Sequence, residues 1–262
     1  MRCPFTRMIK GTEVPCGKCE ICLDNRRRGY SVRLNNAMND YNNVFFCTLT
    51  FRDELIADNK LGFIEPYLNR EQAIRCFQLF MKRFRKEKHL IYKEKIQFAK
   101  LVKYFCVLEK GDLNHRFHWH MLLFTDLSIN EEVMKQCILN SWQYGIVDVK
   151  IATSGSISYL TKYMFKDDYK MLISRGLGFG LDNIEQYIRG SLNYNGFRYS
   201  VPASIISKIR RDNRDFYDDY FKPNRSKNLI EYQRRQEKET KEQAINRYRR
   251  YLIDKNSKEK KF

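Results

Sequence analysis

The sequence predicts an α+β fold in which helices pack on an antiparallel sheet. Three observations lead to this prediction. Segments of β-forming residues alternate with segments whose apolar residues recur at helical spacing, two of the β segments flank a short polar turn, and 262 residues suffice for one sizeable core with extensions left over. We expect the order strand, helix, hairpin, helix, strand, helix.

The first half of this pattern follows from composition and periodicity. Residues 44–51 (VFFCTLTF) form a β-rich run, and we expect both of its faces to be at least half buried. Residues 70–88 carry apolar side chains at helical spacing with basic ones opposite, which predicts an amphipathic helix on the sheet. Residues 104–109 and 117–125 are then two strands of an antiparallel hairpin, joined by the polar turn 110–114.

The second half contains two helices and a strand. Residues 128–131 match the capping box Ser-x-x-Glu, so we expect a helix that Ser128 opens and that runs to about Trp142. Residues 146–151 are a further strand. Ser154 or Ser156 caps the last helix, which carries two tyrosines one turn apart.

The net charge favours a nucleic-acid partner. The chain has 49 Lys and Arg against 31 Asp and Glu, a formal charge of +18, and 14% of its residues are aromatic. Excess positive charge favours polyanions through counterion release, and aromatic rings stack on unpaired bases. No apolar run approaches the roughly 18 residues of a membrane span, so we expect no membrane partner.

The eight cysteines form two groups. Four lie inside apolar periodic segments and are predicted to be core residues: Cys47, Cys76, Cys106 and Cys137. The others make a C-x2-C-x2-C cluster with one more cysteine about a dozen residues upstream, the ligand set of a closed tetrahedral Zn²⁺ site: Cys3, Cys16, Cys19 and Cys22. Structural zinc is the leading interpretation, with reduced thiols or an iron–sulfur cluster as alternatives. The following residues 26–28, all arginine, either direct a helix start at phosphate or form a solvated face.

Two histidines one residue apart, His118 and His120, indicate a second metal site. On a strand, residues i and i+2 share a face, so the two imidazoles can converge on one cation. Glu109 closes the strand expected to pair with theirs, and two nitrogens with one carboxylate suit Mn²⁺ or Mg²⁺ acting as a Lewis acid. His115 is a poorer candidate because it belongs to the turn or to the opposite face.

Two tyrosines, Tyr159 and Tyr163, are candidate nucleophiles one helical turn apart. A phenol is a weak nucleophile because its pKa lies near 10. Lys162 and Lys166 each follow a tyrosine by three residues and can stabilise negative charge that develops during attack on a phosphate. With 17 tyrosines in the chain, this pair alone could equally be core; the histidines make it a candidate site.

The order of these motifs resembles that of rolling-circle replication initiators of the HUH endonuclease class. The motifs are Thr48-Leu49-Thr50, His118-Trp119-His120 and the segment 159–166 (YLTKYMFK). Residues 14–19 (VPCGKC) with the arginine run, and residues 174–178 (SRGLG), resemble the replication initiator of the gokushoviruses, Microviridae phages with single-stranded DNA. The resemblance covers residues 1–180; Phe117 and Trp119 depart from the usual proline and tyrosine but touch no ligand.

The resemblance implies an HUH endonuclease fold: an RRM-like antiparallel sheet of about five strands flanked by helices, with the histidines on a central strand. It implies that His118, His120 and Glu109 bind the metal and that Tyr159 and Tyr163 attack DNA. One tyrosine nicks single-stranded origin DNA of the phage and keeps a 5′-phosphotyrosyl link, and the second closes the circle in rolling-circle replication. Host DNA polymerase and helicase, in the cytoplasm of the bacterial host, are the implied partners.

We expect three parts in the chain: a Cys-rich element over residues 1–35, the HUH domain over 40–200, and a basic extension over 201–262. Residues 205–262 contain 18 Lys and Arg against 10 Asp and Glu. Within them, residues 231–254 form either a solvated helix ordered on DNA or a charged tail. Two other functions fit the motifs: an HUH transposase or relaxase, and a non-catalytic protein that binds single-stranded nucleic acid.

Overall fold

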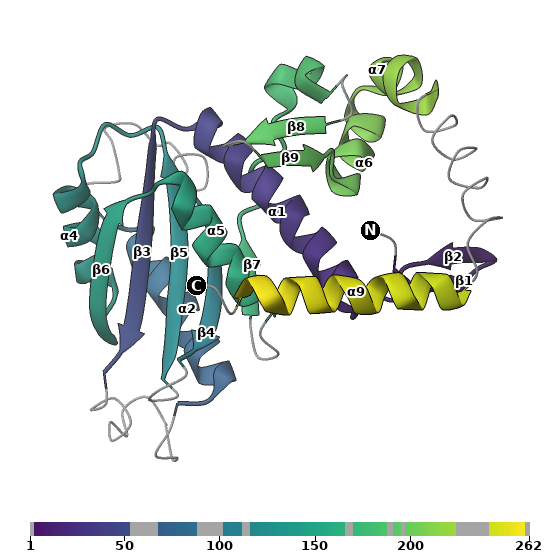
Figure 1. Cartoon of the computed structure of the whole chain (residues 1–262). Helices are drawn as coiled ribbons and strands as arrows, with labels where there is room; N and C mark the ends of the chain where they lie inside the picture. The colour runs from purple at the N-terminus through teal and green to yellow at the C-terminus, as the bar shows by residue number, and fades with distance from the viewer. Residues whose placement is uncertain are drawn as a thin grey trace. The chain divides into compact units, whose positions relative to one another are not determined.

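The chain, seen here in a computed structural model, divides into two compact units (Figure 1). One unit is Tyr30–Gly180, and the other comprises Met1–Gly29 and Leu181–Phe262. The residues that the structure describes are 3–52, 68–87, 102–111, 116–165, 170–187, 191–194, 197–223 and 241–259. The boundary near residue 29 falls inside helix α1, Glu20–Asp40. The predicted division into three parts remains a prediction.

The larger unit is built on a five-stranded antiparallel sheet in the order β6-β3-β5-β4-β7 (Figure 1). Its strands are β3 (Asn43–Phe51), β4 (Val102–Lys110), β5 (Phe117–Thr125), β6 (Gly145–Ile151) and β7 (Lys170–Ile173). Strand β5 is central and pairs with β3 on one side and β4 on the other. The predicted α+β class, the antiparallel sheet and the β4–β5 hairpin are confirmed, while β7 was not foreseen.

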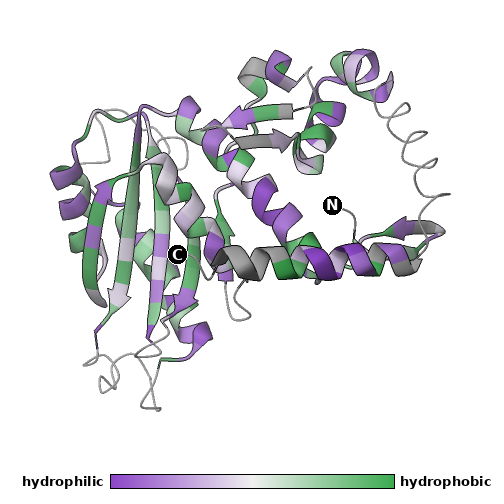
Figure 2. Cartoon of the chain, in the orientation of Figure 1, coloured by the Kyte–Doolittle hydropathy of each residue, from purple (hydrophilic) through white to green (hydrophobic). Residues whose placement is uncertain are grey.

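Side chains that alternate along β5 pack against helices on both faces of the sheet. On one face, Trp119 is fully buried, its ring centroid lies 4.4 Å from that of Phe77, and its Nε1 donates to the Ala73 carbonyl at 3.3 Å. Helices α2 (Arg70–Phe84) and α4 (Glu131–Ser141) cover this face. Figure 2 shows hydrophobic residues concentrated in the strands of this sheet.

The opposite face packs on the second half of α1 and on α5 (Ser154–Lys162). Leu34 of α1 and Leu160 of α5 are fully buried there against Leu122 and Phe124 of β5. The four cysteines predicted to be core residues are at most 1% exposed, which confirms that prediction: Cys47, Cys76, Cys106 and Cys137. The C-terminal part of β5 is thus covered on both sides, and its N-terminal part carries the two histidines.

Helix α4 begins later than predicted. Its N-cap is Asn130, whose side-chain oxygen accepts a hydrogen bond from the backbone of Val133 at 2.9 Å. The prediction that Ser128 opens this helix was wrong. Asn130 is the favoured cap because it places Glu131 and Glu132 in the first turn, where negative charge stabilises the helix dipole.

Helix α5 ends before the second tyrosine. Its N-cap is Thr153, and Ser156 accepts a hydrogen bond from the Thr153 backbone at 3.0 Å, so Ser156 completes the capping box and Ser154 is simply the first helical residue. Tyr163 stands at the C-cap and opens the 3₁₀ turn η4, Tyr163–Phe165. The two tyrosines therefore lie on a helix and the turn that follows it.

The smaller unit joins the two ends of the chain. Its elements besides the start of α1 are β1 (Arg7–Ile9), β2 (Thr12–Val14), η5 (Leu181–Tyr187), β8 (Ser191–Tyr194), β9 (Phe197–Ser200), α6 (Ala203–Asp212), α7 (Arg214–Phe216), η6 (Tyr217–Phe221) and α9 (Lys241–Glu259). A helix is thus present in the basic C-terminal segment, as α9. Within the described part of the chain, no helix is both long and apolar enough to cross a membrane.

Candidate functional site

The β4–β5 hairpin brings the three predicted metal ligands to one face of the sheet. In its register Glu109 stands opposite His118, and His120 follows on the same face of β5. The Gly111 backbone N–H donates to the Arg116 carbonyl at 2.8 Å and closes the hairpin. His115, the poorer candidate, lies outside the described residues.

His120 is held by hydrogen bonds to both neighbouring strands. Its Nε2 lies 3.0 Å from Glu109 Oε2, and its Nδ1 lies 3.3 Å from Thr48 Oγ1 on β3. Glu109 and His120 are 9% and 6% exposed. Polar groups buried to this extent need partners, so the mutual contact is what makes their burial tolerable.

His118 stands apart from the other two predicted ligands. Its ring is parallel to that of His120, with 6.3 Å between centroids. Among the described residues, only the four N-terminal cysteines have ligand atoms that all lie within 4.8 Å of one another. Since Glu109 and His120 are in contact, His118 is the ligand that must approach for one ion to bind all three. The donor types fit Mn²⁺ or Mg²⁺, and that assignment remains a prediction.

Both tyrosines lie against His120. The Tyr163 ring stacks on His120 at 4.8 Å with 6° between planes, and Tyr159 meets His120 edge-on at 5.5 Å. The two tyrosine rings are 5.1 Å apart, also edge-on. Together with the three candidate ligands they form what we term the sheet cluster: Glu109, His118, His120, Tyr159 and Tyr163.

The two phenols differ in environment. Tyr159 is 45% exposed, whereas Tyr163 is half-buried between His120 and its neighbours. Burial raises the pKa of Tyr163 well above its usual value, and hydrogen bonding to Tyr159 and the nearby negative charge of Glu109 raise it further. Tyr163 is therefore held as a neutral phenol at physiological pH.

The two predicted lysines cannot both be placed. Lys162 is exposed on the last turn of α5. Lys166 lies outside the described residues. The roles of both stay predictions.

Sequence reasoning missed two residues of β3 that contact the site. Phe46 is half-buried, and its ring lies parallel to His120 at 6.1 Å and edge-on to Tyr159 at 5.8 Å. Thr48 is the hydrogen-bond partner of His120 described above. Positions 46 and 48 share one face of a strand, but only the pairing of β3 with β5 shows that this face meets the histidines.

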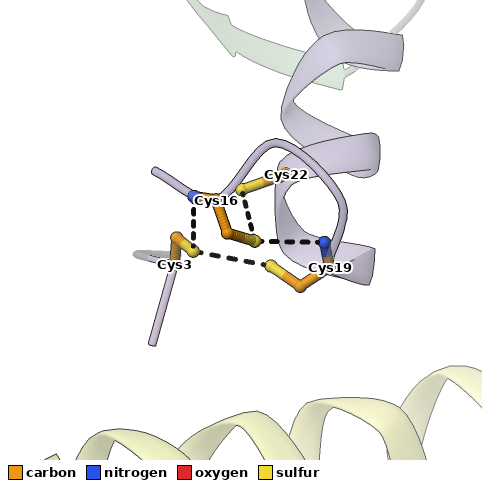
Figure 3. Close-up of side chains that lie close together, drawn as sticks. All are labelled: Cys3, Cys16, Cys19 and Cys22. Carbon is orange, nitrogen blue, oxygen red and sulfur yellow. Dashed lines mark hydrogen bonds between the residues drawn. The ribbon is translucent and has the colours of Figure 1, made fainter. Parts of the chain in front are cut away.

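The N-terminal cysteines form a second, separate cluster (Figure 3). We term Cys3, Cys16, Cys19 and Cys22 the cysteine cluster. Cys16 and Cys22 Sγ are 3.9 Å apart, Cys19 and Cys3 Sγ are 3.6 Å apart, and all four sulfurs lie within 4.8 Å of one another. A cluster of four thiols of this kind could hold a metal such as zinc.

Backbone donors surround Cys16. Burial acts to raise the pKa of its thiol, but hydrogen bonds from the Lys18 and Cys19 backbones and from Cys3 and Cys19 thiols outweigh burial and lower the pKa to about 6. A thiol with this pKa is a thiolate at neutral pH, which is the form that binds metals.

Comparisons with known proteins point to phage replication. A family model of replication-associated proteins, the ORF2 family, matches residues 44–168. The "Replication-associated protein ORF4" of Chlamydia phage 1 is 27% identical over 248 residues, which cover 79% of this chain and 57% of that protein. The "Replication-associated protein VP4" of Bdellovibrio phage phiMH2K is 25% identical over 263 residues, which cover 92% of this chain and 77% of that protein. The chain thus spans little more than half the length of the first relative.

One solved structure is similar in part. The hypothetical protein ORF119 from Sulfolobus islandicus rod-shaped virus 1 shares 16% sequence identity, with a TM-score of 0.30, over 52% of this chain and 92% of that one. A likeness this weak supports neither a fold nor an activity.

Proposed function

Because the chain is a homologue of replication-associated proteins of two Microviridae phages, we propose that it initiates phage DNA replication by nicking single-stranded origin DNA with a tyrosine. The observation that carries the proposal is the position of His120, which contacts a carboxylate, Glu109, and a phenol, Tyr163, at once. Candidate metal ligands and candidate nucleophiles then share one face of the sheet. The host cytoplasm, where phage DNA is copied, is the proposed location.

The proposed reaction is a transesterification. The phenol oxygen of a tyrosine attacks phosphorus, and the bond from phosphorus to the 3′ oxygen breaks. A 5′-phosphotyrosyl link forms, while the leaving 3′ oxygen takes up a proton and the phenol loses one. One phosphate ester replaces another, so the step needs no ATP.

Each residue of the sheet cluster has a proposed role. Mn²⁺ or Mg²⁺ bound by His118, His120 and Glu109 would act as a Lewis acid on a phosphate oxygen. Glu109 also orients His120, and the exposed Lys162 can offset negative charge near Tyr159. The same role for Lys166 beside Tyr163 rests on spacing alone.

We assign the first attack to Tyr159 and the second to Tyr163. Tyr159 is the more exposed phenol, while Tyr163 is half-buried with a raised pKa. Host polymerase would extend the free 3′-OH, with a helicase opening the duplex. Attack by Tyr163 on the regenerated origin would release a 3′-OH that displaces Tyr159 and closes a circle.

The test is formation of a covalent adduct on a labelled origin oligonucleotide with Mn²⁺ or Mg²⁺. The variant with both Tyr159→Phe and Tyr163→Phe should form no adduct, whereas Tyr220→Phe, which removes an exposed phenol of the other unit, should match the unmodified protein. An adduct in the double variant would show that the nucleophile assignment is wrong. If Tyr163→Phe alone abolishes the first nick and Tyr159→Phe does not, the proposed order is reversed.

Two outcomes would favour another function. Salt-sensitive binding of single strands without cleavage, indifferent to divalent metal and to His120→Ala, would indicate a non-catalytic nucleic-acid-binding protein. A mobile element rather than a small circular genome with a capsid gene around the coding sequence would indicate a transposase or relaxase.

A further inference from the structure

We propose that the cysteine cluster binds one Zn²⁺ and that this ion, more than apolar packing, holds residues 3–29 and helix α9 together. The proposal concerns the smaller unit and is independent of the nicking reaction. It assigns the ion a structural role and names α9 as the element that depends on it.

The spacing of the sulfurs fits a single tetrahedral ion. Four sulfurs at about 2.3 Å from a central Zn²⁺ lie about 3.8 Å from one another. Two of the sulfur pairs, Cys3 with Cys19 and Cys16 with Cys22, are 3.6 and 3.9 Å apart. Disulfide-bonded sulfurs would lie about 2.0 Å apart. In a four-iron cluster each iron takes its own thiolate at a corner, which spreads the sulfurs farther than around one ion.

Backbone N–H groups already point at the sulfurs. The Cys16 N–H donates to Cys3 Sγ at 3.3 Å, and the N–H groups of Lys18 and Cys19 donate to Cys16 Sγ at 3.4 and 3.3 Å. A dication with four thiolates carries a net negative charge, which such donors stabilise. Helix α1 starts at Glu20, directly after Cys19, so the turn that presents these donors leads into the helix (Figure 3).

Residues 3–29 contain almost no hydrophobic core in the part of the segment that the structure describes. The buried side chains there are Cys3, Pro4, Ile21 and Cys22. The larger apolar residues near the N-terminus are exposed: Phe5 at 45%, Met8 at 65% and Ile9 at 46%. Segments below about 40 residues seldom bury enough surface to fold without a metal or a disulfide. Here the free energy of metal binding would supply much of the free energy of folding.

Helix α9 rests on this same segment. The Tyr248 ring meets Phe5 edge-on at 5.5 Å, and its phenol hydrogen bonds to the Glu20 backbone. Tyr251 lies close to Asp24 of α1. None of the α9 side chains that the structure describes is buried. Contacts to residues that follow the cysteines therefore hold α9, and loss of the ion would loosen them.

The first experiment measures metal in the full-length protein. We expect one zinc per chain by mass spectrometry, and Co²⁺ in its place should give thiolate charge-transfer bands and the visible bands of a tetrahedral site. Cys19→Ser should lose both, while Cys76→Ala, a buried cysteine of the sheet unit, should keep both. A protein that binds no zinc and shows no tetrahedral Co²⁺ spectrum would overturn the proposal, as would equal losses in both variants.

The second experiment measures hydrogen exchange in α9. Removing zinc with a chelator should speed exchange of α9 amides by roughly tenfold or more while amides of β3, β4 and β5 change little. Tyr248→Ala should speed α9 exchange with zinc still bound, which separates docking of the helix from binding of the ion. Unchanged α9 exchange after zinc removal would overturn the role given to the ion. Because the readout is exchange, the result stands whether or not the chain nicks DNA.

Discussion

The sheet cluster and the cysteine cluster stand on opposite kinds of support. Glu109, His118 and His120 project from a central hairpin of a sheet with buried apolar layers on both faces. The cysteines belong to a segment in which Ile21 is the largest buried apolar side chain among the described residues of 3–29. The fold would position the first set of ligands without an ion, whereas the second set needs its ion to be positioned at all.

This difference teaches where stability and chemistry can be separated. At the sheet, alternate residues of β5 divide the work: Trp119 faces the core, while His118 and His120 face the site. A ligand can be changed there without removing core packing. In the cysteine cluster, each ligand is also a support, so binding and folding are lost together.

The comparison is broken most directly by truncating one buried apolar residue in each unit. Trp119→Ala should cost about 3–5 kcal/mol because a fully buried ring stacked on Phe77 is lost. Ile21→Ala, measured with zinc bound, should cost about 2 kcal/mol or less because few apolar neighbours surround it. Hydrogen exchange resolves the two units, and an equal or larger cost at Ile21 would contradict the proposed reliance on the ion.

Removing a carboxylate sharpens the contrast from the side of function. Glu109→Gln keeps the shape of the side chain but removes its charge, so adduct formation should fall about 10²- to 10³-fold while the free energy of unfolding changes by about 1 kcal/mol or less. Glu132→Gln, an exposed position on α4, is the matched control and should change neither. Retained activity would remove Glu109 from the metal site, and a loss that follows unfolding would make its role structural.

A glycine pair in the turn after β7 tests how tightly the sheet unit is packed. Gly178 has φ +66°, and an added Cβ would lie 1.8 Å from the Arg33 carbonyl oxygen, while Gly176 has φ +82° with nothing within 4 Å. Gly176→Ala should cost about 1 kcal/mol from backbone strain alone, and Gly178→Ala about 3 kcal/mol or more because backbone must move. Similar melting temperatures for the two variants would show that this close approach is not rigid.

Local pattern was enough for most of the strands and helices. The runs at residues 44–51 and 117–125 are apolar on both faces because the sheet is covered on both sides, and such runs are visible in sequence. The start of α4 was misplaced because Ser128 and Asn130 both satisfy local capping rules. Strand β7 has only four residues, too few to show a period.

The site was predictable as far as one hairpin reaches. Period two and an antiparallel turn place Glu109 beside the histidines without knowledge of other strands. Phe46 and Thr48 were missed because the pairing of β3 with β5 joins residues about seventy positions apart, and nothing local encodes that register. The packing of the tyrosines on His120 is non-local for the same reason.

The smallest expected effect concerns Thr48, which we expect to position His120 rather than to contact DNA. A hydrogen bond from Thr48 to Nδ1 would fix the ring so that Nε2 faces Glu109. Thr48→Val removes the hydroxyl but keeps the shape, so the Mn²⁺ concentration needed for half-maximal nicking should rise about tenfold, with little change at saturating metal.

Thr48→Ser retains the hydroxyl and should restore the lower Mn²⁺ requirement. If the serine and valine variants need equal metal, the bond to His120 does not orient the ring, and packing alone holds it. The cysteine cluster has no equivalent test, because its donors to sulfur are backbone N–H groups that no side-chain change removes. A side chain of β3 can tune the sheet cluster without unfolding it because the sheet, and not the ion, sets the distance between strands.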